Sequence, residues 1–119
     1  MRLGHVTGII MYKDTELCWF DVNDTIVDYR PIGVSAEYTP WEFRNGYSAS
    51  AVLDWLLDRL PEDNRHGLFE LCQERGIRMI GEDILKVSNG REIGDRCWIK
   101  FNDGPQTAKE ALSMFVDCR

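Results

Sequence analysis

The sequence has no long hydrophobic run and no closely paired cysteines. No apolar stretch comes near the ~20 residues that a membrane-spanning helix needs, and the start of the chain lacks the apolar segment and cleavage site of a signal peptide. The four cysteines lie far apart, at positions 18, 72, 97 and 118, without the C-x-x-C spacing of a metal or redox site. We therefore expect a cytoplasmic protein with reduced, buried thiols, no disulfide, no metal and no cofactor.

Catalytic motifs and histidines are also scarce. The sequence contains no G-x-S-x-G, G-x-x-x-x-G-K-[ST], H-E-x-x-H or G-x-G-x-x-G pattern, which are the short signatures of hydrolases, nucleotide-binding loops, zinc proteases and dinucleotide-binding domains. Its two histidines, His5 and His66, are better explained by solvation or helix capping than by general-base catalysis. We predict that the protein is not an enzyme.

Basic residues are outnumbered by acidic ones, 14 to 20, and the net charge is -6 at pH 7. A protein that binds nucleic acid by itself needs a concentrated basic surface, so we expect no direct contact with nucleic acid. An acidic surface serves solubility, or it docks on a basic partner, since charge complementarity accelerates association. Composition leaves both interpretations open.

With 44% hydrophobic and 29% charged residues, the composition is that of one globular domain over residues 1–119. The patterns along the chain predict an α+β fold. β-Branched and aromatic residues predict a small N-terminal antiparallel β-sheet. It contains a hairpin of strands 6–12 and 17–22, followed by two short strands over 25–29 and 32–38.

Helix-capping residues and helix breakers predict two helices in the middle of the chain. Ser48 or Ser50 is expected to cap a helix that ends near Leu60, before Pro61. Asp63 or Asn64 is expected to cap a second helix that ends at Gly76, which gives an αα-hairpin with a very short corner.

The last third is predicted to contain a short element, a late strand and a final helix. Residues 84–87 fit either a helix or a strand, and Asn89-Gly90 is a dipeptide typical of hairpin turns. A strand over 97–101 follows. Thr107 and Glu110 form a capping-box pattern at the start of a C-terminal helix.

Trp55 is the apolar residue on the polar side of the first predicted helix. In helical projection the predicted core face is one arc formed by Val52, Leu53, Leu56, Leu57 and Leu60. Trp55 lies ~130° from the centre of that arc, among Asp54, Asp58 and Arg59. Either another layer of the protein covers Trp55, or Trp55 is an exposed anchor for a protein partner with Arg59 beside it, since both residue types are enriched at interfaces.

Several short motifs follow one another between residues 8 and 101. They are Gly8-Ile9-Ile10, Phe20-Asp21-Val22, the 34–40 stretch, Tyr47-Ser48 through Arg59-Leu60-Pro61-Glu62, and Gly90-Arg91-Glu92-Ile93-Gly94 before Cys97-Trp98-Ile99. In this order they resemble the small N-terminal subdomain of HipA-family kinases, including its free-standing form, HipS, in tripartite HipBST toxin–antitoxin systems. Asp63 replaces the Gly that usually follows Leu-Pro-Glu, Asp95-Arg96 replace Ala-Leu after Gly94, and the 104–119 tail has no family counterpart.

The resemblance implies a subdomain without its kinase. HipS-like proteins act as antitoxins that bind and restrain a separate serine/threonine kinase of the HipT type, alongside a DNA-binding protein of the HipB type. The implied mechanism is steric: the subdomain docks near the nucleotide cleft, and its helix corner limits the active conformation of the kinase. The candidate partner-binding residues are Trp55, Arg59, Glu62, Asp63 and Asn64, with Trp41 and Phe43 as outer candidates that alternatively pack against the sheet edge.

Two other functions fit the same sequence. The first is an acidic phage-borne or immunity-type inhibitor that occludes a nuclease or a nucleic-acid-binding complex, because small size and negative charge suit that role equally well. The second is an enzyme subunit that uses a thiol.

Overall fold

Three consecutive strands form an antiparallel meander at the N-terminus. A computed structural model describes residues 1–61, 67–91 and 96–115, and in it β1 (His5–Tyr12), β2 (Thr15–Asn23) and β3 (Ile26–Pro31) pair in sequence order. The predicted hairpin and third strand are confirmed. Lys13 and Asp24 take the left-handed backbone conformation that tight turns between such strands require.

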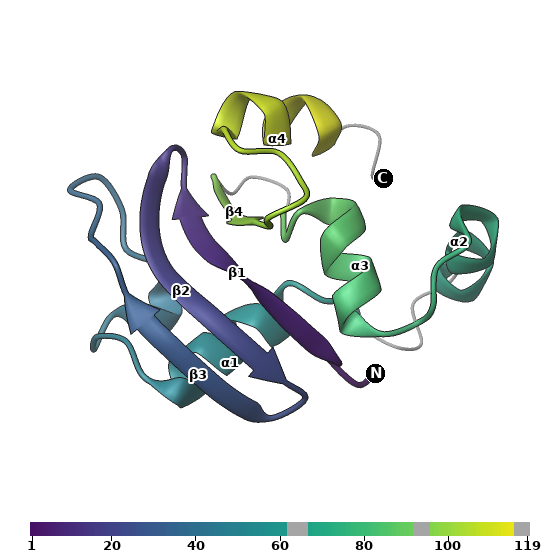
Figure 1. Cartoon of the computed structure of the whole chain (residues 1–119), viewed down its shortest axis with the longest axis horizontal. Helices are drawn as coiled ribbons and strands as arrows, with labels where there is room; N and C mark the ends of the chain where they lie inside the picture. The colour runs from purple at the N-terminus through teal and green to yellow at the C-terminus, as the bar shows by residue number, and fades with distance from the viewer. Residues whose placement is uncertain (62–66, 92–95, 116–119) are drawn as a thin grey trace.

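A late strand completes the sheet. β4 (Cys97–Lys100) pairs antiparallel with the end of β1, which gives the strand order β3-β2-β1-β4 (Figure 1). The antiparallel sheet with helices added to it confirms the predicted α+β class.

The predicted fourth strand over 32–38 is wrong. Residues 32–40 form a connection without regular structure that leads to the short 3-10 helix η1 (Trp41–Phe43). Its start is held by the amides of Ile32 and Gly33, which both donate to the Leu17 carbonyl. The chain bends at 36–37, where Glu37 binds Lys13, so the alternating apolar pattern of this stretch finds no strand partner.

The first helix, α1 (Ala49–Asp58), begins as predicted. The Ser48 hydroxyl accepts a hydrogen bond from the Ala51 amide at 3.1 Å, which satisfies a first-turn donor. The helix crosses one face of the sheet and packs against β3 and η1 (Figure 1).

The second helix, α2 (Leu68–Arg75), ends at Gly76 as predicted, with Gly76 in the left-handed conformation. The predicted αα-hairpin is not formed: α1 ends at Asp58, α2 begins at Leu68, and α2 lies beyond α3, away from α1 (Figure 1). The residue that caps α2 is Gly67, whereas the predicted caps Asp63 and Asn64 lie outside the described residues.

The ambiguous 84–87 stretch belongs to a helix, α3 (Gly81–Ser88), which packs near β1. Asn89 and Gly90 both have positive φ and end this helix, so the dipeptide turns the chain from α3 into β4 rather than joining two strands. The Asn89 carbonyl accepts a hydrogen bond from Ile99 in β4 at 2.7 Å.

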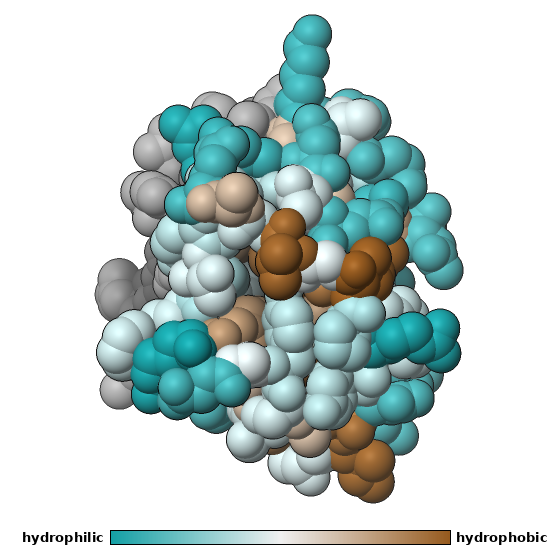
Figure 2. Space-filling model, turned by 90° about the vertical axis from the view of Figure 1, so that its left-hand side faces the viewer, coloured by the Kyte–Doolittle hydropathy of each residue, from teal (hydrophilic) through white to brown (hydrophobic). Residues whose placement is uncertain are grey.

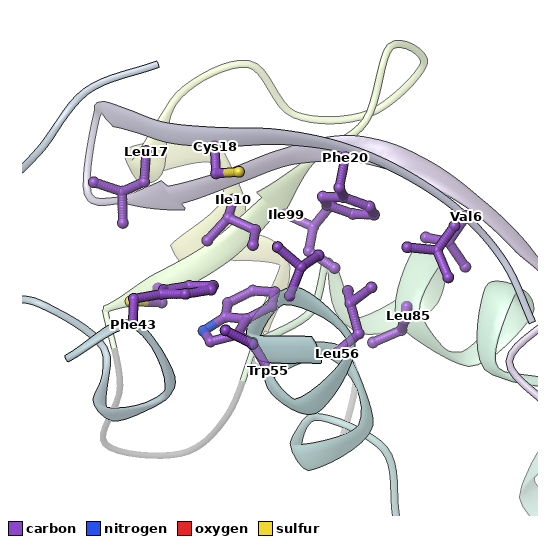
Figure 3. Close-up of a cluster of buried hydrophobic side chains, with 14 of the residues drawn as sticks. Val6, Ile10, Leu17, Cys18, Phe20, Phe43, Trp55, Leu56, Leu85 and Ile99 are labelled. Carbon is purple, nitrogen blue, oxygen red and sulfur yellow. The ribbon is translucent and has the colours of Figure 1, made fainter. Parts of the chain in front are cut away.

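The two faces of the sheet are covered by different elements. Ile10, Cys18, Phe20 and Ile99 point to the main core, where they meet Trp55 and Leu56 of α1 (Figure 3). On the opposite face Met11 and Trp98 pack against Ala111 of α4 (Ala108–Phe115). The predicted capping residue Thr107 accepts from the Glu110 amide, and the Ala108 amide donates to Asp14 in the β1–β2 turn. The described part of the 104–119 tail is therefore packed on the sheet.

None of the helices within the described ranges has the length and apolar composition that a membrane crossing needs.

Candidate functional site

Trp55 lies inside the main core. Its side chain is 0% exposed and sits on α1 beside Leu56, with Phe43 of η1 next to it (Figure 3). The prediction that Trp55 is exposed on the polar side of the helix is wrong, and the alternative that another layer covers it is confirmed. The reason is that η1 packs against α1, so the buried face of the helix consists of Ala51, Val52, Trp55 and Leu56.

Leu57 takes the exposed position that was predicted for Trp55. It was placed in the core arc by projection, but its side chain is 44% exposed. Burying the tryptophan removes more apolar surface from water than burying a leucine, so the helix turns its ring inward and leaves Leu57 outside.

Phe43 is also a core residue, with 3% exposure. Its ring centroid lies 4.7 Å from that of Tyr47, and the Tyr47 hydroxyl donates to the Gly33 carbonyl at 3.4 Å. For Phe43 the predicted alternative, internal packing, is therefore the observed one.

Arg59 ends α1 and covers Trp55 instead of standing beside it on an open surface. Its guanidinium carbon is 4.3 Å from the Trp55 ring centroid, and its Nη1 donates to the Gly90 carbonyl at 3.4 Å. This contact joins the Leu-Pro corner after α1 to the Gly-Arg turn before β4. The other predicted corner residues, Glu62, Asp63 and Asn64, lie outside the described residues.

Trp41 is the predicted site residue that the structure leaves exposed, at 70%. It opens η1, directly after the buried Pro40. Arg44 fixes it from one side: the Arg44 guanidinium lies 3.9 Å from the ring centroid, and its Nη1 donates to the Trp41 carbonyl at 2.9 Å. A large aromatic side chain is thus held outside the core on a short, hydrogen-bonded turn.

Exposed hydrophobic side chains gather in the connection that leads to Trp41. Ile32, Val34 and Tyr38 are 46%, 81% and 42% exposed. This connection lies on the side of the molecule that Figure 2 shows, where hydrophobic (brown) side chains appear as separate islands among pale and hydrophilic ones. Tyr38 stacks on Tyr12, with ring centroids 5.2 Å apart, and exposed hydrophobic residues that are scattered singly are common on protein surfaces.

Two carboxyl groups link η1 to the end of α1. Partial burial raises the pKa of the Glu42 carboxyl above its ordinary value of 4.5, and a hydrogen bond with Asp58 raises it further. Trp41 directly precedes Glu42 in η1 and Leu57 directly precedes Asp58 in α1, so the two elements that carry this acidic pair also carry the two exposed apolar side chains. We call Trp41, Glu42, Leu57 and Asp58, together with Asp54 one helical turn away, the acidic docking surface.

An open pocket of about 410 Å³ adjoins this surface between the N-terminal residues, the β2–β3 turn and α1. Leu3, Leu53 and Leu57 supply its apolar wall. On its rim Arg2 donates to both carboxylate oxygens of Asp24, at 3.2 and 3.0 Å, and this guanidinium holds the pKa of the Asp24 carboxyl below its ordinary value.

On the open part of the opposite sheet face, His5 and Thr7 share one carboxylate. The Asp21 Oδ1 atom accepts from the Thr7 hydroxyl at 2.5 Å and from His5 Nε2 at 2.6 Å, and these contacts lower the pKa of Asp21. The hydroxyl therefore donates to the carboxylate, whereas an activated nucleophile would donate to the imidazole.

Within the described ranges, no three His, Cys, Asp or Glu side chains come together in a way that would hold a metal ion. Cys18, Cys72 and Cys97 are buried, and burial raises the pKa of the Cys18 thiol to about 11. A thiol in this state is a poor nucleophile.

No protein-family model, curated protein or solved structure matches the chain. The resemblance to the HipA-family subdomain stays a prediction from the order of its motifs.

Sequence reasoning did not name Glu42, Asp54 or Leu57 as candidate site residues: it placed Asp54 on the polar side of the helix and Leu57 in the core arc. One signal was present in the sequence: Asp54 and Asp58 occupy the C-terminal half of α1, where the helix dipole disfavours negative charge, and no basic residue occupies its last turn. Negatively charged residues that destabilise their own helix are candidates for contact with a partner.

Proposed function

We propose that the chain is a non-catalytic antitoxin of the cytoplasm that binds and restrains a serine/threonine kinase of the HipT type. The observation that carries this proposal is Trp41, a tryptophan kept 70% exposed by a stacked arginine. Exposing so large an aromatic surface costs folding free energy, and tryptophan and arginine are the residue types most enriched among interface hot spots. The family resemblance supplies the class of partner.

The contact between Arg59 and the Gly90 carbonyl supports the resemblance. The Leu-Pro corner and the Gly-Arg turn are two separate motifs of the family pattern, and in this chain they lie against each other across the end of α1.

The proposed mechanism is inhibition by docking. The acidic docking surface binds the kinase near its nucleotide cleft and favours an inactive conformation. The inhibition can be no stronger than the difference in affinity for the inactive and active states. A HipB-type DNA-binding protein would be the second partner, and contact with DNA would pass through it.

Affinity purification of the chain from its native host, followed by mass spectrometry, tests the proposal. We expect a serine/threonine kinase to co-purify, and co-expression of the chain to rescue cells from that kinase. Trp41→Ala should weaken the complex, because it removes the exposed anchor. His5→Ala, on the opposite face of the sheet, is the matched control and should bind normally. Absence of any kinase from the purified complex would overturn the proposal.

An acidic inhibitor of a nuclease or nucleic-acid-binding complex is the second candidate. The observation that favours it is the pair Asp54 and Asp58, which form no ion pair within the described residues and would suit the basic surface of such a target. The same purification separates the two candidates, because the second predicts a nuclease or nucleic-acid-binding protein in place of a kinase.

A further inference from the structure

β3 is an edge strand whose outer side has no partner strand. It is the outermost strand of the sheet, and among the described residues it pairs only with β2 (Figure 1). An open edge presents a row of amides and carbonyls with which another extended strand can pair. Proline and bulges commonly block such edges, but β3 has its proline only at its last position, Pro31.

The pairing with β2 determines which backbone groups of β3 face outward. The ladder continues to Ile32, whose amide donates to the Leu17 carbonyl at 2.9 Å. Because hydrogen-bonded and non-hydrogen-bonded pairs alternate along an antiparallel ladder, every second residue counted back from Ile32 also bonds to β2. The residues between them, Val27, Tyr29 and Pro31, therefore turn their backbone groups away from the sheet.

The side chains on the open face of this edge complement their own reverse order. Val27 and Tyr29 pack on the main core, so the residues that alternate with them lie on the opposite face of the sheet. In chain order these are Ile26, Asp28, Arg30 and Ile32. All of them are exposed, and the exposed fractions of the two isoleucines are 76% and 46%. The order is apolar, acidic, basic, apolar, so an antiparallel copy sets apolar against apolar and acid against base.

We propose that the β3 edge pairs with the β3 edge of a second copy of this chain, antiparallel and centred on Tyr29. The Tyr29 amide of each copy donates to the Tyr29 carbonyl of the other. Each Val27 amide donates to the Pro31 carbonyl of the other copy, and the return bond is absent because proline has no amide. The two sheets then form one continuous sheet across a two-fold axis, which is the usual symmetry of a dimer.

Charge selects this register. With the centre at Tyr29, Asp28 lies directly opposite Arg30 of the other copy, in the non-hydrogen-bonded pairs where side chains approach most closely. The two-fold axis makes this contact twice, and it also sets Ile26 opposite Ile32 twice. A centre at Asp28 or at Arg30 would instead place two like charges directly opposite each other, which is destabilising.

The surroundings of Asp28 favour a basic residue on its outer side. Within its own sheet Asp28 lies opposite Asp21, a like charge, and among the described residues no basic side chain forms an ion pair with it. Arg30 has only an aromatic neighbour, the Trp19 ring, with its guanidinium carbon 5.3 Å from the ring centroid. The second copy supplies the opposite charge that each of these residues lacks.

The mass of the full chain in solution is the first test. Sedimentation equilibrium should give twice the 13.8 kDa of one chain. A mass of one chain at a concentration of about 0.1 mM would overturn the proposal, because the Kd of the dimer would then exceed that value. It would assign the open edge to solvent or to a strand of another protein.

Charge reversal tests the register. Arg30→Glu sets Glu against Asp28, and Asp28→Arg sets Arg against Arg30, so each variant alone should raise the Kd of the dimer by about tenfold or more. An equimolar mixture of the two variants restores opposite charges at both contacts and should form a heterodimer with an affinity close to that of the unmodified chain. Dimers of the single variants as tight as the unmodified one, or no dimer in the mixture, would overturn the proposal.

Glu74→Arg is the matched control. It makes the same change in net charge as Asp28→Arg at an exposed position on α2, which lies away from the sheet (Figure 1). This variant should remain a dimer, and an equal loss of affinity would show a general charge effect and overturn the site. Circular dichroism of each variant establishes that its fold is retained. The inference does not rest on the proposed kinase, since it uses the chain alone and no residue of the acidic docking surface.

Discussion

The guanidinium of Arg59 lies over the buried ring of Trp55, 4.3 Å from its centroid. The two residues are one helical turn apart, and Arg59 also reaches the Gly90 carbonyl, so it closes the core at the end of α1. The indole Nε1 donates no hydrogen bond to any described residue, which is a cost that the ring's burial must offset. The pair predicted to form a docking anchor therefore stabilises the fold, whereas Trp41 of η1 and Leu57 of α1 are exposed.

Replacement of Trp55 separates these two roles. Trp55→Ala should lower the free energy of unfolding by about 3–5 kcal/mol, because it removes a fully buried aromatic side chain and leaves a cavity. Trp41→Ala should change it by only about 0.5 kcal/mol, as is usual for an exposed site. Urea denaturation followed by circular dichroism measures both. Similar stabilities of the two variants would contradict the observed burial.

Gly90 is expected to tolerate no side chain. Its φ is 65°, and a Cβ atom would lie 2.6 Å from Cγ1 of Ile99 in β4. Gly90→Ala should thus destabilise the protein by about 2 kcal/mol or more, since backbone strain and overpacking each cost on the order of 1–3 kcal/mol. Gly46→Ala is an informative control: its φ is also positive, at 97°, but nothing lies within 4 Å of the added Cβ. Gly46→Ala therefore measures only the cost of a positive φ at a residue with a side chain. An equal loss of unfolding free energy in both variants would show that the contact with Ile99 is unimportant.

Glu42→Gln should stabilise the protein at neutral pH. The raised pKa of Glu42 means that the folded state holds this proton more tightly than the unfolded state does. Its contribution to stability is thus fully present below the ordinary pKa of 4.5 and is lost as the pH rises through the higher folded value. A glutamine amide donates to Asp58 at every pH, so in thermal unfolding the variant should gain stability relative to the unmodified chain as the pH rises above 4.5, the ordinary pKa of the carboxyl group.

Glu37→Gln provides a control of opposite sign. The hydrogen bond and charge of Lys13 hold the pKa of Glu37 below its ordinary value, so its stabilising contribution is present at neutral pH and lost in acid. This variant should be less stable than the unmodified chain at neutral pH and equal to it in acid. A Glu42→Gln variant with the same pH profile as Glu37→Gln would contradict the Glu42–Asp58 pairing.

Cys18 should resist alkylation in the folded protein. Its thiol is buried, and burial raises its pKa to about 11, so little thiolate is present and none is accessible. In a Cys118→Ser background, iodoacetamide should label Cys18 only after denaturant is added, as mass spectrometry of the peptides would show. Rapid labelling of Cys18 under native conditions would restore the hypothesis of an enzyme subunit that uses a thiol.

Local patterns were sufficient for much of the fold. β-Branched and aromatic residues predicted β1, β2, β3 and β4, the Ser48 cap predicted the start of α1, and Gly76 marked the end of α2. These features depend on backbone conformation and on hydrogen bonds between neighbours in the chain, which sequence determines directly. The 32–38 stretch has the alternation of a strand but no partner, because pairing is a property of the sheet and not of the segment.

The sequence by itself determined the strands that form the sheet, the start of α1, the end of α2 and the acidic charge of the chain. Only the tertiary structure decided which side of α1 is covered. A helical projection ranks faces by their average polarity, whereas burial depends on which elements pack against the helix, and here η1 and the sheet enclose the side that carries Trp55. For the same reason the proposed docking surface contains Trp41 and Leu57 instead of Trp55, because the position of a covering layer is not encoded in the periodicity of the helix that it covers.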